Sequence, residues 1–222
     1  GLYPWENQHN RIGARQRAQA SISEPRRKNA WGRIIKSKIF GQSRTLRSFD
    51  PYASGALLEL SKHVASGDPK NYEAQAARLY WSNLPNGEFF HRIPGNGDPK
   101  NAQYDYAYTI LRGRTIRAVL GAGLSTSLGL FHRNHSNFFA LADDLIEPFR
   151  PAVDDVVVAL DPAEPLNPDM KKQLVNASNR VFNDAGETIP TVMNQFAQQL
   201  GKYCEGDAAY LEVPRWKGPE LK

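Results

Sequence analysis

The sequence has one cysteine, Cys204, among its 222 residues, and no apolar run approaches the roughly 20 residues that span a bilayer. A lone cysteine forms no internal disulfide, and without a cysteine cluster there is no zinc-finger pattern. No signal peptide, internal repeat or low-complexity block is visible either. These absences exclude disulfide-rich secreted scaffolds and transmembrane proteins. They favour a reducing, cytoplasmic setting with no membrane partner.

The charge is unevenly distributed along a chain whose composition is otherwise globular, with 41% hydrophobic residues. Eleven Lys or Arg and a single acid, Glu24, lie between Arg11 and Arg47, so this segment carries +10. The net charge of +5 therefore leaves −5 for the rest of the chain. A basic end joined to an acidic remainder suits a protein that binds a polyanion and chelates a metal. A solvated basic helix face is the simpler alternative.

A basic amphipathic helix is expected after Ser23, a residue typical of the N-cap. Its apolar positions recur at helical spacing, so one face packs into a core while the lysines and arginines lie elsewhere. The apolar positions are Trp31, Ile34, Ile35 and Ile39.

The remaining pattern is also helical. Asp68 is expected to cap a helix with Pro69 in its first position, and a proline likewise starts a long helix at 99–120. The run "VDDVVVAL" would suit a strand by propensity, but Pro151 and the acid-rich first turn favour a helix. The sequence thus predicts an all-α, multi-helix globular domain, with further helices at 53–66, 137–149, 169–178 and 187–203.

The stretch "HRNHSNFFALADDLIEP" concentrates histidines and acids beside an apolar stripe. In a helix, Asp144 and Glu147 share one face, next to the core. His132 precedes Glu147 by fifteen residues, about 22 Å along a continuous helix, so the two share an ion only if the helix breaks at "HRNHSN". A third ligand must come from elsewhere, and Glu73 is the acid best placed. Ion pairs with arginine, and a capping histidine, are the alternatives.

Three strings carry a family resemblance: "DPKNYEAQAARLYW", "NAQYDYAYTILRGRTIRAVLGAGLSTSLGLFHRNHSNFF" and "LADDLIEPFRP". Together they resemble the CRISPR-associated integrase of spacer acquisition, the universal adaptation nuclease, from about residue 1 to residue 202. The string "ALADDLIEPFRP" is most similar to the corresponding segment of the type II branch. The resemblance implies the helical catalytic domain of a divalent-metal-dependent DNA endonuclease and integrase.

The resemblance also implies a site. Glu73, His132 and Glu147 match the positions that hold Mg²⁺ or Mn²⁺ and carry catalysis, and Asp144 matches a position that assists in some members. His135 does not match a ligand position and is expected in a loop or facing DNA.

Domain limits and partners follow from the same resemblance. Residues 1–10 look like a linker from an N-terminal β domain that is not in this sequence, 11–203 like the helical catalytic domain, and 204–222 like an irregular tail. The implied partners are double-stranded DNA, as captured fragment and CRISPR repeat, and a small ferredoxin-like adaptation protein. A homodimer is expected for the full-length protein.

In the implied reaction, the 3′-hydroxyl of a captured fragment attacks a phosphodiester of the repeat, which is mainly a problem of positioning and charge neutralisation. Candidate DNA contacts are Arg78, Arg112 and Arg114, and more broadly the basic face from Arg26 to Lys38. Two alternatives remain. One is a non-catalytic helical DNA-binding subunit, and the other is an unrelated phosphodiesterase centred on His132 and His135.

Overall fold

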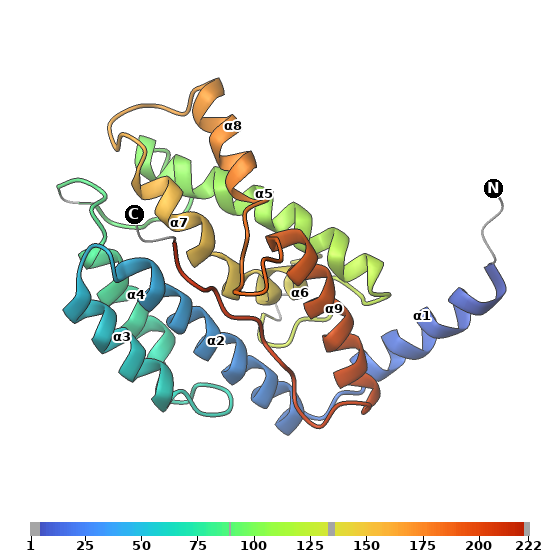
Figure 1. The fold of residues 1–222 in the computed structure, drawn as a ribbon. Helices are drawn as coiled ribbons and strands as arrows, with labels where there is room; N and C mark the ends of the chain where they lie inside the picture. Colours follow the sequence, from blue (N-terminus) through green and yellow to red (C-terminus); the bar gives the residue numbers. More distant parts are fainter. Residues whose placement is uncertain (1–4, 89, 133–135, 220–222) are drawn as a thin grey trace.

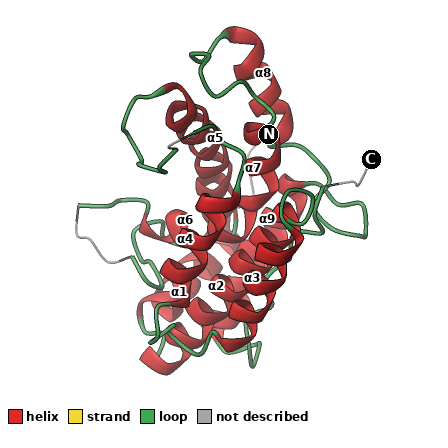
Figure 2. Cartoon of the chain, turned by 90° about the vertical axis from the view of Figure 1, so that its left-hand side faces the viewer, coloured by secondary structure: helices red, strands yellow, loops and turns green. Residues whose placement is uncertain are grey.

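The computed structural model describes residues 5–88, 90–132 and 136–219, with side chains from residue 12 onward. Every regular element in these ranges is helical, which confirms the all-α prediction (Figures 1 and 2). No helix in the same ranges is both long and apolar enough to cross a membrane. The elements are α1 (Trp5–Ala20), α2 (Glu24–Leu46), α3 (Pro51–His63), α4 (Tyr72–Asn83), α5 (Pro99–Gly121), α6 (Ala140–Leu145), the 3₁₀ helix η1 (Glu147–Phe149), α7 (Pro151–Val158), α8 (Pro168–Ala177) and α9 (Ile189–Glu205).

Three helices begin with the same chemistry: a capping side chain followed by proline in the first turn. The side chain of Asp50 accepts from the backbone of α3, Asp98 from that of α5, and Asn167 from that of α8. Each cap satisfies a backbone N–H that has no partner within the helix, and proline has no N–H to lose. These starts therefore follow directly from local sequence.

Helix α2 runs through the middle of the fold (Figure 1) and contacts α3 and α4 as well as α6, η1 and α7. Trp31, Ile34, Ile35 and Ile39 are buried, as their spacing predicts. The segment after α9 has no helix or strand within the described residues, and it runs beside α2, where Ser37 Oγ donates to the carbonyl of Pro214. Because different elements pack on its two sides, residues on one side of α2 have different neighbours from residues on the other side.

The start of α4 differs from the sequence prediction. Its N-cap is Asn71, not Asp68, and Pro69 lies in the preceding loop. Asp68 and Asn71 both have positive φ values, 48° and 52°, which a helix does not allow. Asp68 still helps the helix to start, because its carboxylate accepts from the backbone N–H groups of Tyr72 and Glu73.

The helix expected over 137–149 is also shorter than predicted. It is divided into α6 and η1, because Pro148 has no N–H to donate to the carbonyl of Asp144 and its ring crowds that turn. At the other end of the chain, α1 continues without a break across residue 10, where the sequence predicts the boundary between the linker and the catalytic domain.

Candidate active site

Helices α2 and α4 bring a lysine and a glutamate together beside η1. Lys38 Nζ lies 2.6 Å from Glu73 Oε1 and 2.6 Å from Glu147 Oε2. One ammonium group therefore lies between two carboxylates that are 74 residues apart in the chain. Burial lowers the pKa of Lys38, but Glu147 and Glu73 more than offset this, so its pKa lies above the usual value. The two carboxylates therefore favour the charged form of the lysine.

Glu147 is buried in the turn of η1, with 4% of its surface exposed. Its Oε1 lies 3.0 Å from Arg150 Nη2, and its Oε2 lies 2.6 Å from Lys38 Nζ. Burial raises the pKa of Glu147, yet Arg150 and Lys38 outweigh it, so the pKa lies below the usual value. Two neighbouring cations thus favour the ionised form of a buried carboxylate.

His132 is oriented by Asp144 from α6. His132 Nδ1 lies 2.7 Å from Asp144 Oδ1, and this hydrogen bond is the main reason that the pKa of His132 is raised above 6.5. Asp144 also accepts from the backbone N–H groups of Leu130, Phe131 and His132. Such a turn requires Gly129, because a Cβ there would lie 2.3 Å from the carbonyl oxygen of His132.

The three expected ligands are not assembled as a metal site. Among the residues that the structure describes, no three His, Cys, Asp or Glu side chains lie in a metal-binding arrangement. The contacts give the physical reason: the ammonium of Lys38 lies between Glu73 and Glu147.

The residues nevertheless fit a divalent cation. Two carboxylates, one of them almost completely buried, already share one positive charge. A histidine that ligates a metal usually gives its other ring nitrogen to a carboxylate, and His132 has this arrangement with Asp144. Oxygen ligands with one imidazole suit Mg²⁺ or Mn²⁺. For an ion to bind between the two carboxylates, Lys38 would have to leave that position.

Two other sequence candidates are placed differently. Both oxygens of Asp144 are occupied by hydrogen bonds, which suits a residue that orients His132 better than a direct ligand. His135, the centre of the alternative phosphodiesterase, lies outside the described residues.

The expected DNA-contacting arginines divide into two groups. Arg112 pairs with Asp143 at 2.5 Å, and Arg114 Nε donates to Ser178 Oγ at 2.9 Å, so both are engaged within the fold. Arg78 is exposed on α4.

The sequence analysis placed Lys38 on the basic face of α2, away from the packed side, and this prediction is wrong, because Lys38 is largely buried between Glu73 and Glu147. A signal for this position was present, because Lys38 follows Trp31 by seven residues and therefore lies on the same side of α2 as buried apolar residues. A lysine on the packed side of a helix needs a counter-ion, and here it has two.

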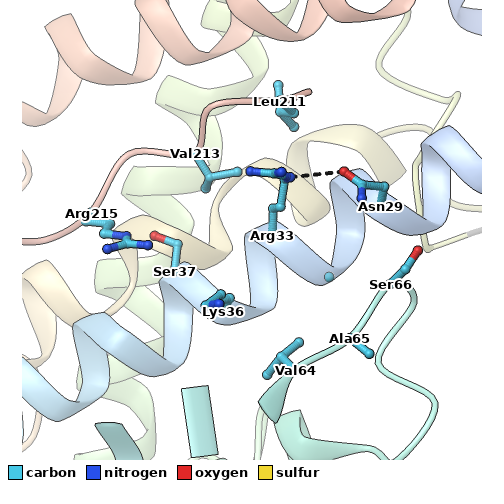
Figure 3. A pocket seen from close by; sticks show the side chains of 11 residues that line it. Asn29, Arg33, Lys36, Ser37, Val64, Ala65, Ser66, Leu211, Val213 and Arg215 are labelled. Carbon is cyan, nitrogen blue, oxygen red and sulfur yellow. Dashed lines mark hydrogen bonds between the residues drawn. The ribbon is translucent and has the colours of Figure 1, made fainter. Parts of the chain in front are cut away.

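A basic groove lies on the other side of α2 (Figure 3). Arg33 and Lys36 from α2 and Arg215 from the C-terminal segment line a hollow of about 290 Å³, and no acid is among its lining residues. At 100° per residue, Lys36 lies about 160° around the helix from Lys38. Arg33 Nε donates to Asn29 Oδ1 at 3.0 Å, so the three positive charges of the basic groove have no carboxylate among the residues beside them.

Solved structures with this arrangement of helices share a fold at low sequence identity. A casposase bound to integration product matches 94% of this chain and 69% of its own, with a TM-score of 0.69 and 23% identity. A partial Cas6-RT-Cas1–Cas2 complex matches 100% and 76%, with a TM-score of 0.76 and 21% identity. A Cas1 protein from Thermotoga maritima matches 89% and 75%, with a TM-score of 0.67 and 18% identity. The chain therefore shares its helical fold with these Cas1 and casposase structures.

The family follows from sequence. The model for CRISPR associated protein Cas1 matches residues 2–187, and the chain belongs to this family. The CRISPR-associated endonuclease Cas1 of Neisseria meningitidis is 42% identical over 143 residues, covering 64% of this chain and 46% of the relative. One from Francisella tularensis subsp. novicida is 31% identical over 175 residues, covering 67% and 55%. The chain thus spans about half the length of these relatives, and the family resemblance seen in the sequence is confirmed.

Proposed function

We propose that this chain provides the divalent-metal-dependent active site of DNA cleavage and strand transfer, by which captured fragments are inserted as spacers into a CRISPR array. The observation that carries the proposal is the pair of carboxylates, Glu73 and Glu147, held around one cation beside an oriented His132. Relatives named as Cas1 endonucleases and a structural neighbour named as a casposase with its integration product support it.

Each side chain has a separate task in this proposal. Glu73, His132 and Glu147 would hold Mg²⁺ or Mn²⁺, which supplies a positive charge to polarise the scissile phosphate and to favour the deprotonated nucleophile. Asp144 keeps the ring of His132 in place. Lys38, released from the carboxylates, carries a positive charge that can face the phosphate instead.

The reaction joins one strand and breaks another. The 3′-hydroxyl of the captured fragment attacks the phosphorus at the edge of the repeat, forming a new P–O bond. The bond to the repeat's own 3′-oxygen breaks, and that oxygen takes up a proton in place of the one the hydroxyl lost. With water as nucleophile the same site hydrolyses DNA.

The DNA backbone needs a positive surface, and the basic groove supplies one together with exposed Arg78. Structural neighbours that are Cas1–Cas2 complexes support a partner of the Cas2 kind. We propose that this partner is small and ferredoxin-like and that the full-length protein acts as a homodimer in the cytoplasm.

The test is calorimetric titration of Mn²⁺ into the wild-type chain and into His132→Ala, with melting curves for both. We expect binding by the wild type, loss of binding in the variant and an unchanged melting temperature. His91→Ala, which removes an exposed imidazole from a loop, is the matched control and should bind as the wild type does.

A non-catalytic DNA-binding subunit remains the second candidate, because the acids of the cluster are all ion-paired in the structure. In that case the divalent ion has no effect on melting or DNA cleavage by any of these proteins. Equal Mn²⁺ binding by wild type and His132→Ala would contradict the role given to His132.

A further inference from the structure

The turn before α4, residues 65–71, has an unusual backbone conformation. Asp68 and Asn71 have positive φ values, 48° and 52°, in a region that few residues other than glycine occupy. Asparagine and aspartate adopt it most readily, because their short polar side chains bond to nearby backbone groups. Such a conformation costs free energy and persists only where its surroundings hold it. The turn is therefore fixed by the contacts on its two sides.

Helix α2 fixes the first half of the turn. The backbone N–H of Gly67 donates to the carbonyl of Lys28 at 2.8 Å. Gly32 lies so close to the turn that a Cβ on it would be 2.5 Å from the carbonyl oxygen of Ala65. The backbone N–H of Asp68 donates to that same carbonyl at 3.0 Å. The position of Asp68 is thus set relative to α2, the helix that runs through the middle of the fold.

The second half of the turn is joined to the first turn of α4. The carboxylate of Asp68 accepts from the backbone N–H of Tyr72 through Oδ1 and from that of Glu73 through Oδ2, each at 2.9 Å. Asn71 Oδ1 accepts from the N–H of Ala74 at 3.3 Å. The first N–H groups of a helix have no partner within it, and helix ends fray. Both oxygens of Asp68 therefore hold the turn that carries Glu73.

Glu73 depends on the position of its backbone more than Glu147 does. The side chain of Glu147 is 5% exposed and is enclosed by the core, whereas that of Glu73 is 26% exposed and lies in the first turn of its helix. The core restricts Glu73 less, so the place of its carboxylate, 2.6 Å from Lys38 Nζ, relies on the place of that turn.

We propose that Asp68 is a positioning residue for Glu73. Its carboxylate ties the start of α4 to the turn beside α2, and so sets where the Glu73 carboxylate lies relative to Glu147 and His132. Loss of an outer group that orients a metal ligand typically lowers metal affinity about 10–100-fold. The inference rests on the proposed function, since it assigns Asp68 a task toward the same metal ion.

The test compares two aspartates that cap helices. Asp68→Asn keeps the size of the side chain, tolerates the positive φ and replaces one carboxylate oxygen by an amide nitrogen, which accepts no hydrogen bond. Asp50→Ala removes the carboxylate that accepts from the N–H groups of Tyr52 and Ala53 in α3, a helix with none of the proposed ligands. Both variants should melt below the wild type, since each weakens a cap.

Mn²⁺ is titrated calorimetrically at a temperature at which all three proteins are folded. We expect Asp68→Asn to bind Mn²⁺ about tenfold more weakly than the wild type, and Asp50→Ala to bind it as the wild type does. The loss in Asp68→Asn should persist in about 1 M KCl, where the screening length is roughly 3 Å and a missing charge has little effect at a distance. Asp68→Gly, which suits the positive φ and removes both acceptors, gives the same comparison if Asp68→Asn does not fold.

The possible results separate positioning from other roles. Unchanged Mn²⁺ affinity in Asp68→Asn overturns the positioning role and leaves the proposed function in place. A loss that disappears in high salt assigns the effect to charge, and an equal loss in Asp50→Ala assigns it to general destabilisation; either result overturns positioning by Asp68. If the wild type binds no Mn²⁺, alone or with a branched DNA, the proposed function fails and the positioning role fails with it.

Discussion

The two sides of α2 both carry lysine, yet they differ in how its charge is matched. On the active-site side, Lys38 is enclosed by Glu73 and Glu147. On the other side, Lys36 lies in the basic groove, where no acid is among the lining residues. An ammonium group that lies between two carboxylates occupies a position where a metal ion could bind in its place. A group of cations without acids marks a place for an anion.

Burial separates the two sides further. The side chain of Lys38 is only 13% exposed, and Glu147 is almost completely buried, so loss of one partner leaves a charge away from water. The cations of the basic groove stay in contact with solvent, where charge changes cost little stability. Substitutions on the first side should therefore change both activity and folding, and those on the second side DNA affinity alone.

The largest effect is expected for Glu147→Gln. Polarisation of the phosphate contributes several kcal/mol, so removal of this ligand should lower strand transfer and cleavage at least about 1,000-fold. Gel assays with Mn²⁺ measure the loss. Glu59→Gln removes a carboxylate from an exposed ion pair and should leave the rate unchanged; a variant at Glu147 that retained a tenth of the activity would contradict the assignment.

Lys38→Met is expected to expose the competition between lysine and metal. Without divalent ion, the paired carboxylates lose their counter-ion, which should cost about 3 kcal/mol and lower the melting temperature by roughly 6–12 °C. Mn²⁺ should bind the variant more tightly than it binds the wild type, because no ammonium has to be displaced.

Melting curves with and without Mn²⁺ test this prediction, and Lys62→Met, from an exposed pair with Glu59, serves as control. An Mn²⁺ affinity that falls in Lys38→Met would mean that the lysine assists the ion and does not compete with it.

The basic groove is tested by the salt dependence of DNA binding. Each phosphate neutralised adds about 0.9 to the slope of log K against log salt, so replacing Arg33, Lys36 and Arg215 together by glutamine should reduce the slope by about 3. The melting temperature should stay within about 2 °C of the wild type, as for other exposed substitutions. An unchanged slope would remove the basic groove from the DNA interface.

A pH-dependent effect on stability is also expected from Asp154, whose carboxyl accepts hydrogen bonds from the hydroxyls of Tyr80 and Tyr108. Burial raises the pKa of Asp154 from its ordinary 3.8 to about 7. Because the folded state keeps this proton more tightly than the unfolded state, the stability contribution is complete below pH 4 and is lost as pH rises through 7. In Asp154→Asn this loss is absent.

The melting temperature of the wild type, relative to Asp154→Asn, should therefore fall between pH 4 and pH 7. A difference that stays constant across this window would show that Asp154 is ionised throughout.

The helix ends show most clearly how much of the fold the sequence predicts. The helix predicted from Pro99 matches the start of α5, where Asp98 caps the first turn, because proline and cap both act on the turn that follows them. The start of α4 was wrong by three residues, because the two positive φ values before it are not encoded in any simple pattern. The division between α6 and η1 could have been anticipated from Pro148.

The candidate site shows the same limit. The motif positions of Glu73, His132 and Glu147 were available from the sequence, but the partners that set their state were not. Lys38 lies 35 residues before Glu73 and 109 before Glu147, and such separations give no local signal. Arg112 and Arg114 were plausible DNA contacts in the sequence until their positions beside Asp143 and Ser178 became visible.

By itself, the sequence determined the helical class, most helix starts, the buried face of α2 and the family, since all of these depend on spacing, capping or matched strings. Only the tertiary structure decided that one ammonium joins the two acids, that Asp144 is used to orient His132, and that α2 has a neutralised side and a positive side. Charges interact through space and not along the chain, so their pairing is fixed only when the helices pack.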